Sequence, residues 1–220
     1  MINNNILIFD LGWTLEDEQD AQIDRAEKAV KLCDELGINI SVEEILDLQN
    51  NCGRNGIANV FKSALMKLGL SSSEMETATK NSSWDISKLK LFPDAEFVVK
   101  RLSINNDLGI IANQSVSPEG RLKNYGIYDY FKFIVSSCDV GFEKPDPRIF
   151  QIAEQKYDIN NRNIWMIGDR IDNDIVPAKA LGWITVRILQ GSHKLQKPMN
   201  ENETANFTIY SLMELLDIFD

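Results

Sequence analysis

Acidic side chains follow apolar runs at two points of this 220-residue chain. The run 6–9 leads directly into Asp10, and the run 164–167 leads through a glycine into Asp169, with Asp174 shortly after. Carboxylates that share a site repel one another unless a cation lies between them. Oxygen ligands of this kind suit Mg²⁺, which also binds water and substrate phosphate. If the fold brings these acids together, the pattern predicts a magnesium site.

Two further polar residues follow the same logic. Asn113 follows the apolar run 108–112, and Lys144 lies in a loop with glycine and proline. A lysine beside a carboxylate cluster neutralises an anionic substrate as a compact point charge. Acids, Mg²⁺ and a lysine in one crevice are the equipment for phosphoryl transfer, where positioning and charge stabilisation dominate. Taken singly, Asp10 is as well explained as a turn cap and Lys144 as a solvated turn lysine, so the interpretation depends on the combination.

Strands must alternate with helices to place these residues at one edge of a sheet. Apolar runs predict strands at 6–9, 108–112, 133–135, 164–167, 184–186 and 207–209. Helices are predicted at 95–102, 118–125, 148–157, 175–181 and 212–218. This alternation indicates an α/β fold with a doubly wound, mostly parallel sheet and right-handed crossovers. In such a sheet ligands bind outside the carboxyl ends of the strands, where the polar residues fall.

A helical block separates the first strand from the others. Helices are predicted at 21–36, 42–48, 57–68 and 73–80, with a loop rich in turn-forming residues at 50–56. The second of these helices begins with Ser41 and Glu44, a capping-box pattern. Because the block is too long for an ordinary crossover connection, we expect an inserted helical cap over 16–90 and a core formed by 1–15 and 91–220.

Composition excludes several classes of function. The net charge is −10, with no basic run, which argues against binding to nucleic acid. No stretch approaches the roughly 20 apolar residues of a membrane helix, and no signal peptide is recognisable. Three cysteines without metal-ligand spacing predict reduced thiols and a cytoplasmic setting. The one histidine, His193, has no assigned role, and the oligomeric state is not predicted.

Four motifs resemble those of the haloacid dehalogenase-like (HAD) hydrolases. The first motif of that family, an apolar strand before Asp-x-Asp-x-Thr, resembles residues 6–14. The second, a strand ending in Ser or Thr and often followed by Asn, is similar in position to 110–113. The third, a lysine, lies in a familiar setting at 141–150, and the fourth, Gly-Asp and a later acid, resembles 168–175. The resemblance implies a Rossmann-like core, with the helical cap inserted between the first two motifs.

The resemblance also implies a catalytic role for the acids. Asp10 would be the nucleophile that forms an aspartyl-phosphate intermediate. Asp10, the main-chain carbonyl of Gly12 and Asp169 would hold Mg²⁺, and Asp174 would be a further ligand. Asp172, which lies between the two acids of the fourth motif, is not expected to take part.

The expected substrate contacts lie around this nucleophile. Lys144 would bind phosphate and pair with Asp10, and the main chain at Ala112 and Asn113 would contribute an N–H donor. Trp13 would narrow the pocket or stack on a ring, although core packing explains it equally well. Arg54 lies in a loop that resembles the substrate-facing loop of relatives with this kind of cap. It would clamp a second anionic group, unless it is simply an exposed surface arginine.

Two positions depart from the family pattern. Gly12 stands where most phosphatases of the family carry the second Asp, which protonates the leaving group and later activates water. A missing general acid–base residue costs on the order of 10²–10⁴ in rate, roughly 3–5 kcal/mol of barrier. Ala112 replaces the hydroxyl residue of the second motif, which removes one hydrogen bond to phosphate, about 1–2 kcal/mol.

These departures leave three interpretations of function. The leading one is a slow or selective Mg²⁺-dependent phosphatase for a small phosphorylated metabolite, in which Glu16, Asp17 or the substrate supplies the proton. The second is a phosphate-binding or regulatory protein with little turnover. The third is a 2-haloacid dehalogenase, which needs no second Asp. Dehalogenases do not need Mg²⁺ either, whereas the acids after Gly168 match the metal-binding form of the motif.

Overall fold

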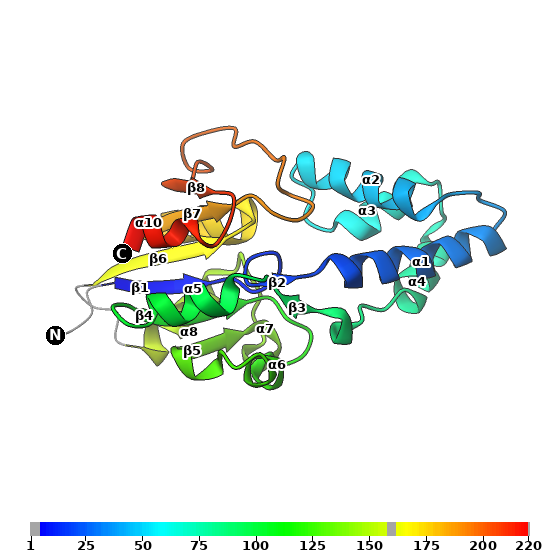
Figure 1. The fold of residues 1–220 in the computed structure, drawn as a ribbon. Helices are drawn as coiled ribbons and strands as arrows, with labels where there is room; N and C mark the ends of the chain where they lie inside the picture. The colour runs from blue at the N-terminus through cyan, green and yellow to red at the C-terminus, as the bar shows by residue number, and fades with distance from the viewer. Residues whose placement is uncertain (1–4, 158–161, 220) are drawn as a thin grey trace. The chain divides into compact units, whose positions relative to one another are not determined.

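A computed structural model of the chain describes residues 5–157 and 162–219. The chain forms two compact units (Figure 1). The core unit comprises Met1–Glu16, Leu91–Gln190 and Pro198–Asp220, and the helical unit comprises Asp17–Lys90 and Gly191–Lys197. The sequence-based boundaries assigned all of 91–220 to the core. That assignment is wrong for Gly191–Lys197, because this segment packs on a helix of the helical unit.

Six strands form the sheet of the core unit, in the order β5-β4-β1-β6-β7-β8. Neighbouring strands of this order are parallel. The bounds are β1 Asn5–Phe9, β4 Asp107–Ala112, β5 Phe131–Ser136, β6 Asn163–Gly168, β7 Ile184–Ile188 and β8 Phe207–Ile209. The direction in which strands are added reverses at β1, so the ligand crevice is expected at its carboxyl end. The predicted doubly wound α/β fold is confirmed.

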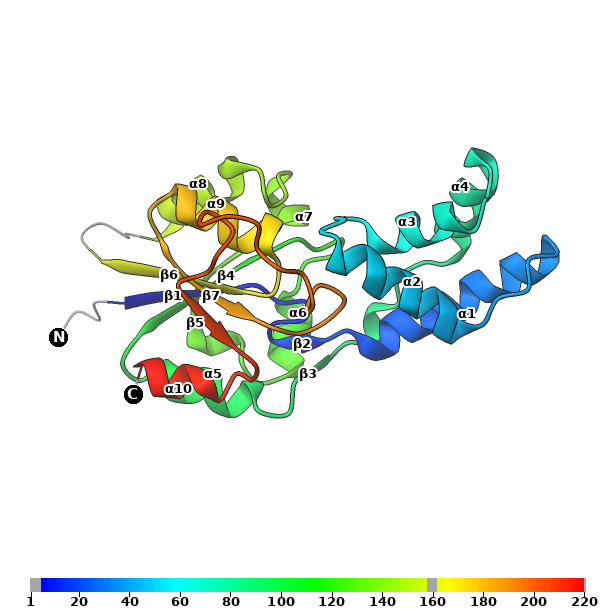
Figure 2. The ribbon, with the colours of Figure 1, turned by 90° about the horizontal axis from the view of Figure 1, so that it is seen from above.

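Helices cover both faces of this sheet (Figure 2). In that view α8 and α9 lie on one side of the strands, and α5 and α10 lie on the other. The bounds in the core unit are α5 Ala95–Leu102, α6 Glu119–Asn124, α7 Ser137–Val140, α8 Pro147–Lys156, α9 Val176–Ala180 and α10 Glu214–Phe219. Short turns of other helix types occur at η2 (Tyr128–Tyr130) and η3 (Ile171–Ile175), of which η3 is a π-helix.

The central strand β1 supplies side chains to both layers of the core. Ile6 and Ile8 join the cluster that contains Phe150 of α8, whereas Leu7 and Phe9 join the cluster on the opposite face. Successive side chains of a strand point to opposite faces, so burial on both sides requires an uninterrupted apolar run. The apolar run before Asp10 therefore fixes the direction in which the strand presents that acid.

The helical unit is built from four helices with their own apolar core. The bounds are α1 Gln19–Glu35, α2 Val42–Arg54, α3 Val60–Lys67 and α4 Ser72–Asn81, with the 3₁₀ turn η1 at Ile86–Lys88. The capping box predicted at Ser41 and Glu44 is present. The loop predicted at 50–56 is wrong, because α2 continues through Arg54. Cys52 and Gly53 are buried in that turn, and such packing overrides the weak helix propensity of the neighbouring asparagines.

Two short strands mark the points where the chain passes between the units. β2 (Glu16–Asp17) and β3 (Lys90–Leu91) pair to form a separate two-stranded sheet. The sequence gives no strand pattern there, because two residues are too few to show a period of two. Within residues 5–157 and 162–219, no helix is both long and apolar enough to cross a membrane.

Candidate active site

Three carboxylates meet at the carboxyl ends of the central strands. Asp10 follows β1, Asp169 follows β6, and Asp174 lies in η3. One oxygen from each lies within 4.8 Å of the others. Asp169 and Asp174 are almost completely buried, and the Asp10 side chain is 13% exposed. The fold therefore brings the three acids together, as predicted. Acids this close repel one another unless a cation lies among them.

The glycine before Asp169 makes room for Asp174. A Cβ atom at Gly168 would lie 2.4 Å from the Asp174 carboxyl carbon, which no real Cβ contact permits. The Arg170 amide donates to Asp174 Oδ2 at 3.0 Å, and the Asp10 amide donates to the Ile167 carbonyl at 2.9 Å. These contacts hold the strand ends β1 and β6 and the turn η3 in one arrangement. They explain why the two acids of the fourth motif need a glycine in front of them.

Lys144 is the cation that the structure places among these acids. Its Nζ donates to Asp10 Oδ1 at 2.8 Å and to Asp174 Oδ1 at 2.5 Å, and the residue is 3% exposed. Burial by itself lowers the pKa of Lys144, but the negative charges of Asp10 and Asp174 outweigh it and raise that pKa above its ordinary value. The lysine is therefore a permanent positive charge beside the proposed nucleophile.

The same environment favours the charged form of Lys144 but disfavours the charged form of Asp174. Burial raises the pKa of Asp174 to about 6, against the attraction of Lys144 and with the repulsion of Asp10. A carboxylate this deeply buried gains from any further positive charge brought to the site. The donor set, three carboxylate oxygens around an open approach at Asp10, therefore fits a hard divalent cation such as Mg²⁺.

Asn113 has a positioning role that the sequence did not reveal. Its Oδ1 accepts from the Lys144 amide at 2.7 Å, and its Nδ2 donates to the Lys144 carbonyl at 2.8 Å. The side chain thus holds the main chain on both sides of the lysine. We predicted only a main-chain contribution from Asn113, because residue spacing gives no indication of a partner 31 residues away.

Arg187 is a second residue that the sequence analysis missed. It lies on β7, is 4% exposed, and donates from Nε to the main-chain carbonyl of Asp169 at 3.1 Å. Burial lowers the pKa of Arg187, while the negative charge of Asp169 opposes that shift. A charged residue inside an apolar strand next to the carboxyl end was the available signal. The predicted strand stopped one residue before it.

The turn after Asp10 contains Gly12 and Trp13. The Leu11 carbonyl accepts from the amides of residues 14, 15 and 16, which folds the chain back on itself. Trp13 has a φ of 54°, in the left-handed region, and its amide donates to the Glu16 carbonyl at 2.8 Å. Gly12 is half-buried and does not have a positive φ. Backbone conformation therefore does not require a glycine at this position, so an aspartate would fit its φ.

Glu16 is unsuited to be the missing proton donor. It is completely buried, and its two carboxylate oxygens accept from Arg121 Nε at 2.9 Å and Nη2 at 3.1 Å. Arg121 Nη2 also donates to Gln114 at 2.7 Å. Burial and the Glu16 charge raise the pKa of Tyr125, which adjoins this pair, to about 12. Both oxygens of this carboxylate are already used by one guanidinium group, so Glu16 joins the turn after β1 to α6 and does not face the carboxylate cluster as a free acid.

The other predicted residues lie outside the carboxylate cluster. Ala112 is fully buried at the end of β4. Arg54 is exposed at the last position of α2, in the helical unit. Asp17 also belongs to that unit, where its Oδ1 accepts from the Gln19 amide. Asp172 pairs with Arg170, as expected for a residue outside the metal site.

Comparison with known proteins points in the same direction as the geometry. The family model described as haloacid dehalogenase-like hydrolase matches residues 7–188. The glyceraldehyde 3-phosphate phosphatase of Methanocaldococcus jannaschii is 30% identical, over 96% of this chain and 95% of that protein. A pyrimidine 5'-nucleotidase of Escherichia coli is 29% identical, over 95% and 85%. The structure of a putative HAD hydrolase from Bacillus subtilis, bound to magnesium, aligns over 99% of both chains with a TM-score of 0.68 and 21% identity.

Proposed function

The chain belongs to the haloacid dehalogenase-like hydrolases and acts as a phosphatase on a small phosphorylated metabolite; we propose that Asp10 is its nucleophile and Mg²⁺ its cofactor. One observation carries the proposal. The Asp10 carboxylate lies 2.8 Å from a buried lysine and shares its site with two buried acids. A nucleophilic carboxylate beside a fixed cation is the arrangement that phosphoryl transfer needs.

The donor set supports Mg²⁺ as the cofactor. Hydrolases of this family generally use Mg²⁺. In this chain Asp10, Asp169 and the carbonyl of Gly12 would hold the ion, with Asp174 as a further ligand. When bound, the ion neutralises negative charge on the phosphate and orients it. Gly12 lacks only a side chain, so its substitution for aspartate leaves the main-chain ligand in place.

The residues of this chain account for both halves of the reaction. A carboxylate oxygen of Asp10 attacks phosphorus, the bond from phosphorus to the ester oxygen breaks, and the alcohol departs with that oxygen. Lys144 Nζ balances charge on the phosphate oxygens, held in place by Asn113. Water then attacks the phosphorus of the acyl phosphate, releases inorganic phosphate and restores Asp10. The water proton passes to solvent.

Gly12 determines which substrates react well. The departing alkoxide needs a proton, and neither Gly12 nor the fully paired Glu16 supplies one. Substrates whose leaving group is already a weak base need no such proton, so aryl phosphates should react much faster than alkyl phosphates. For an alkyl substrate the proton has to come from solvent or from the substrate itself. We therefore propose slow or selective turnover.

The substrate assignment rests on relatives and on the helical unit. The Methanocaldococcus jannaschii relative makes triose phosphates the first class to test, and the Escherichia coli relative makes nucleoside monophosphates the second. We propose that the helical unit acts as the cap and that Trp13 and Arg54 contact substrate.

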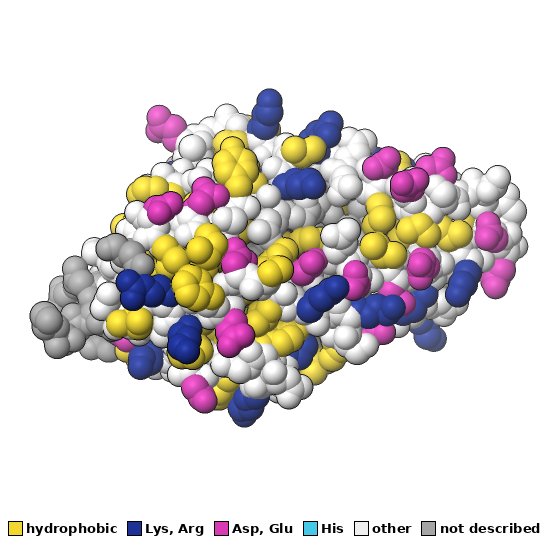
Figure 3. All heavy atoms as spheres, viewed as in Figure 1, with side chains coloured by type: hydrophobic (Ala, Val, Ile, Leu, Met, Phe, Trp, Pro, Cys, Tyr) yellow, Lys and Arg dark blue, Asp and Glu magenta, His cyan; other side chains and the backbone are white. Residues whose placement is uncertain are grey.

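On the face shown in Figure 3, acidic and basic side chains are interspersed, without a continuous basic field. Three free cysteines support a cytoplasmic setting.

A second candidate function is phosphate binding without turnover. Gly12 favours it, because that position carries no group to protonate an alcohol or to activate water. Ala112 adds to it by removing a hydroxyl donor. The dehalogenase interpretation has less support, since halide displacement needs one nucleophilic carboxylate and no metal, whereas three carboxylates are grouped here. Phosphate release, halide release from a 2-haloacid and phosphate binding, measured on the same variants, separate the three candidates.

The test is phosphate release from glyceraldehyde 3-phosphate, a pyrimidine 5'-monophosphate and p-nitrophenyl phosphate, each with Mg²⁺ or with EDTA. The variants are Asp10→Asn and the matched control Asp172→Asn, whose acid pairs with Arg170 outside the cluster. We expect Mg²⁺-dependent release that Asp10→Asn abolishes and Asp172→Asn retains. Undiminished phosphate release by Asp10→Asn, or halide release from a 2-haloacid without metal, would contradict the proposal. Mg²⁺-dependent phosphate binding with no turnover would establish the second candidate.

A further inference from the structure

The helical unit contains a polar pocket of its own. A cavity of about 360 Å³ lies between α2 and the segment Gly191–Lys197. Its polar lining comes from Asp47, Asn50, Asn51 and Arg54 of α2 and from Ser192 and Lys194 of the segment. Because both walls belong to the helical unit, the pocket is defined without reference to the core.

The two walls are fitted to each other at the level of the main chain. A Cβ atom at Gly53 would lie 2.1 Å from the Ser192 carbonyl oxygen, so only a glycine lets the segment lie against α2. The Gln22 amide donates to Ser192 Oγ at 2.9 Å and to Gln49 Oε1 at 3.0 Å. His193 Nε2 lies 3.3 Å from the Ile57 carbonyl. The segment is therefore seated at several points, and the pocket beside it is a formed feature.

Arg54, Lys194 and Ser192 bring hydrogen-bond donors to the lining of this pocket. Ser192 is 5% exposed and already accepts from Gln22, so its own O–H is left to donate. Within the described part of the chain, the Arg54 and Lys194 side chains have no carboxylate partner. A pocket that offers an arginine, an ammonium and a buried hydroxyl suits a group with oxygen acceptors and negative charge.

We propose that this pocket binds a small hydroxylated oxyanion, such as a phosphate ester or a hydroxy acid. Arg54 and Lys194 hold the anionic group, and the Ser192 hydroxyl donates to it. Asp47, the one acid in the lining, accepts from hydroxyl groups at the other end of the ligand. The proposal does not depend on the chemistry at Asp10. Two ligands have this chemistry. One is the end of the substrate remote from the reacting phosphate, called its far end here, and the other is a separate metabolite.

The only histidine of the chain is a reporter for this site. His193 lies between Ser192 and Lys194, so histidine-selective isotope labelling gives one imidazole signal beside the pocket. The protein used is full-length Asp10→Asn without Mg²⁺, which prevents turnover. Inorganic phosphate and glycerol 3-phosphate are titrated at constant pH, against sodium chloride at equal ionic strength. We expect saturable movement of the signal with both anions, reached at lower concentration with glycerol 3-phosphate.

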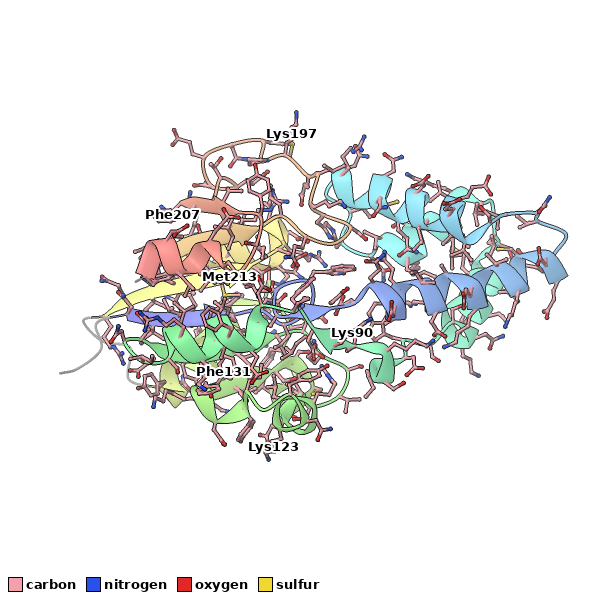
Figure 4. All side chains as sticks on the ribbon, in the orientation of Figure 1. Lys90, Lys123, Phe131, Lys197, Phe207 and Met213 are labelled. Atoms are coloured by element: carbon pink, nitrogen blue, oxygen red, sulfur yellow. The ribbon has the colours of Figure 1, made fainter. Side chains whose placement is uncertain are left out.

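Variants that remove one charge each test whether the anions bind at Arg54 and Lys194. Arg54→Gln and Lys194→Gln should each weaken the binding by about 2- to 5-fold, the range for partly exposed charge pairs. Together they should abolish saturation. The matched control is Lys197→Gln, the same charge change at the end of the same segment (Figure 4). Lys197 is not among the residues that line the pocket. A signal that drifts as with chloride, or equal weakening by Lys197→Gln, would overturn the proposal.

Kinetics on the enzyme with its natural Asp10 distinguishes the two sources of ligand. If the ligand is the far end of the substrate, Arg54→Gln and Lys194→Gln raise KM in assays of phosphate release and leave kcat nearly unchanged. If it is a separate metabolite, KM stays the same, and added glycerol 3-phosphate still moves the His193 signal. Should the protein turn over no substrate, the binding titration still stands, so failure of the proposed phosphatase and failure of this pocket give different results.

Discussion

The carboxylate cluster of the core unit and the pocket of the helical unit both contain basic side chains, but the surroundings of these side chains differ. In the core unit Lys144 is 3% exposed and donates to two carboxylates. In the helical unit Arg54 and Lys194 are exposed and have no carboxylate partner in the described structure. A buried charge must be paired before any ligand arrives, whereas an exposed charge is already satisfied by water.

This difference in burial and pairing determines which ligand chemistry suits each site. The core site groups three carboxylates, so the proposed Mg²⁺ would offset their repulsion of a phosphate. In the helical-unit pocket, Arg54 and Lys194 would contact the proposed oxyanion directly. Substitutions that exchange the same residue type in the two sites should therefore have very different effects.

The largest effect should come from Gly12→Asp in the core unit. Its backbone conformation does not exclude an aspartate, and a carboxyl group there would protonate the departing oxygen. Release from an alkyl phosphate should rise by on the order of 10²–10⁴, and release from p-nitrophenyl phosphate much less. The measurement is kcat for substrates of graded leaving-group acidity. An equal gain for all of them would show that protonation is not what limits the natural chain.

The two lysines provide the sharpest comparison of stability. Lys144→Met leaves the buried Asp174 carboxylate and the partly buried Asp10 carboxylate without their cation and should lower the free energy of unfolding by about 3–5 kcal/mol. Mg²⁺ should restore part of that loss. Lys194→Met, the same change at an exposed position, should stay within about 0.5 kcal/mol. Urea titrations with and without Mg²⁺ measure the free energy of unfolding of both variants. Similar losses would contradict the difference in burial and pairing between Lys144 and Lys194.

A smaller loss is expected at the buried ion pair between Glu16 and Arg121. Arg121→Gln leaves Glu16 buried with one neutral donor in place of a bidentate cation. This should reduce the free energy of unfolding by about 1–3 kcal/mol. Because Glu16 is not the proton donor, the preference for aryl over alkyl phosphates should persist in this variant. A collapse of that preference would reinstate Glu16 as a participant in proton transfer.

A local rearrangement is expected for Gly53→Ala in α2. Alanine improves helix propensity by roughly 1 kcal/mol, which offsets part of the clash with the Ser192 carbonyl. The segment must move even so, because the new Cβ cannot remain 2.1 Å from that oxygen. We expect a displaced His193 signal and loss of anion binding, with phosphate release from p-nitrophenyl phosphate unchanged. An unshifted signal would show that the segment is not seated as described.

The sequence predicted what depends on local pattern. The apolar run before Asp10 identified β1, and glycine at 168 with two acids identified the turn that carries Asp169 and Asp174. The grouping of these acids with Lys144 follows from parallel strands sharing one edge. Their roles in catalysis and metal binding stay predictions that the assays above test.

What the sequence did not predict depends on contacts between distant residues. The Asn113 side chain holding Lys144 and the Arg121 fork on Glu16 join residues that no periodicity relates. The extension of α2 through Arg54 follows from burial of Cys52 and Gly53, which a run of asparagines conceals. The assignment of Gly191–Lys197 to the helical unit rests on a missing side chain at Gly53.

The central claim is that Asp10 attacks phosphorus. With p-nitrophenyl phosphate the first step needs no proton, whereas the second still lacks a group at Gly12 to activate water, so the acyl phosphate should accumulate. The measurement is mass spectrometry of the Asp10 peptide after acid quench during turnover with Mg²⁺. The account predicts one phosphoryl group on Asp10, absent with EDTA and reduced in Gly12→Asp. An unmodified Asp10 in both proteins during steady phosphate release would contradict it.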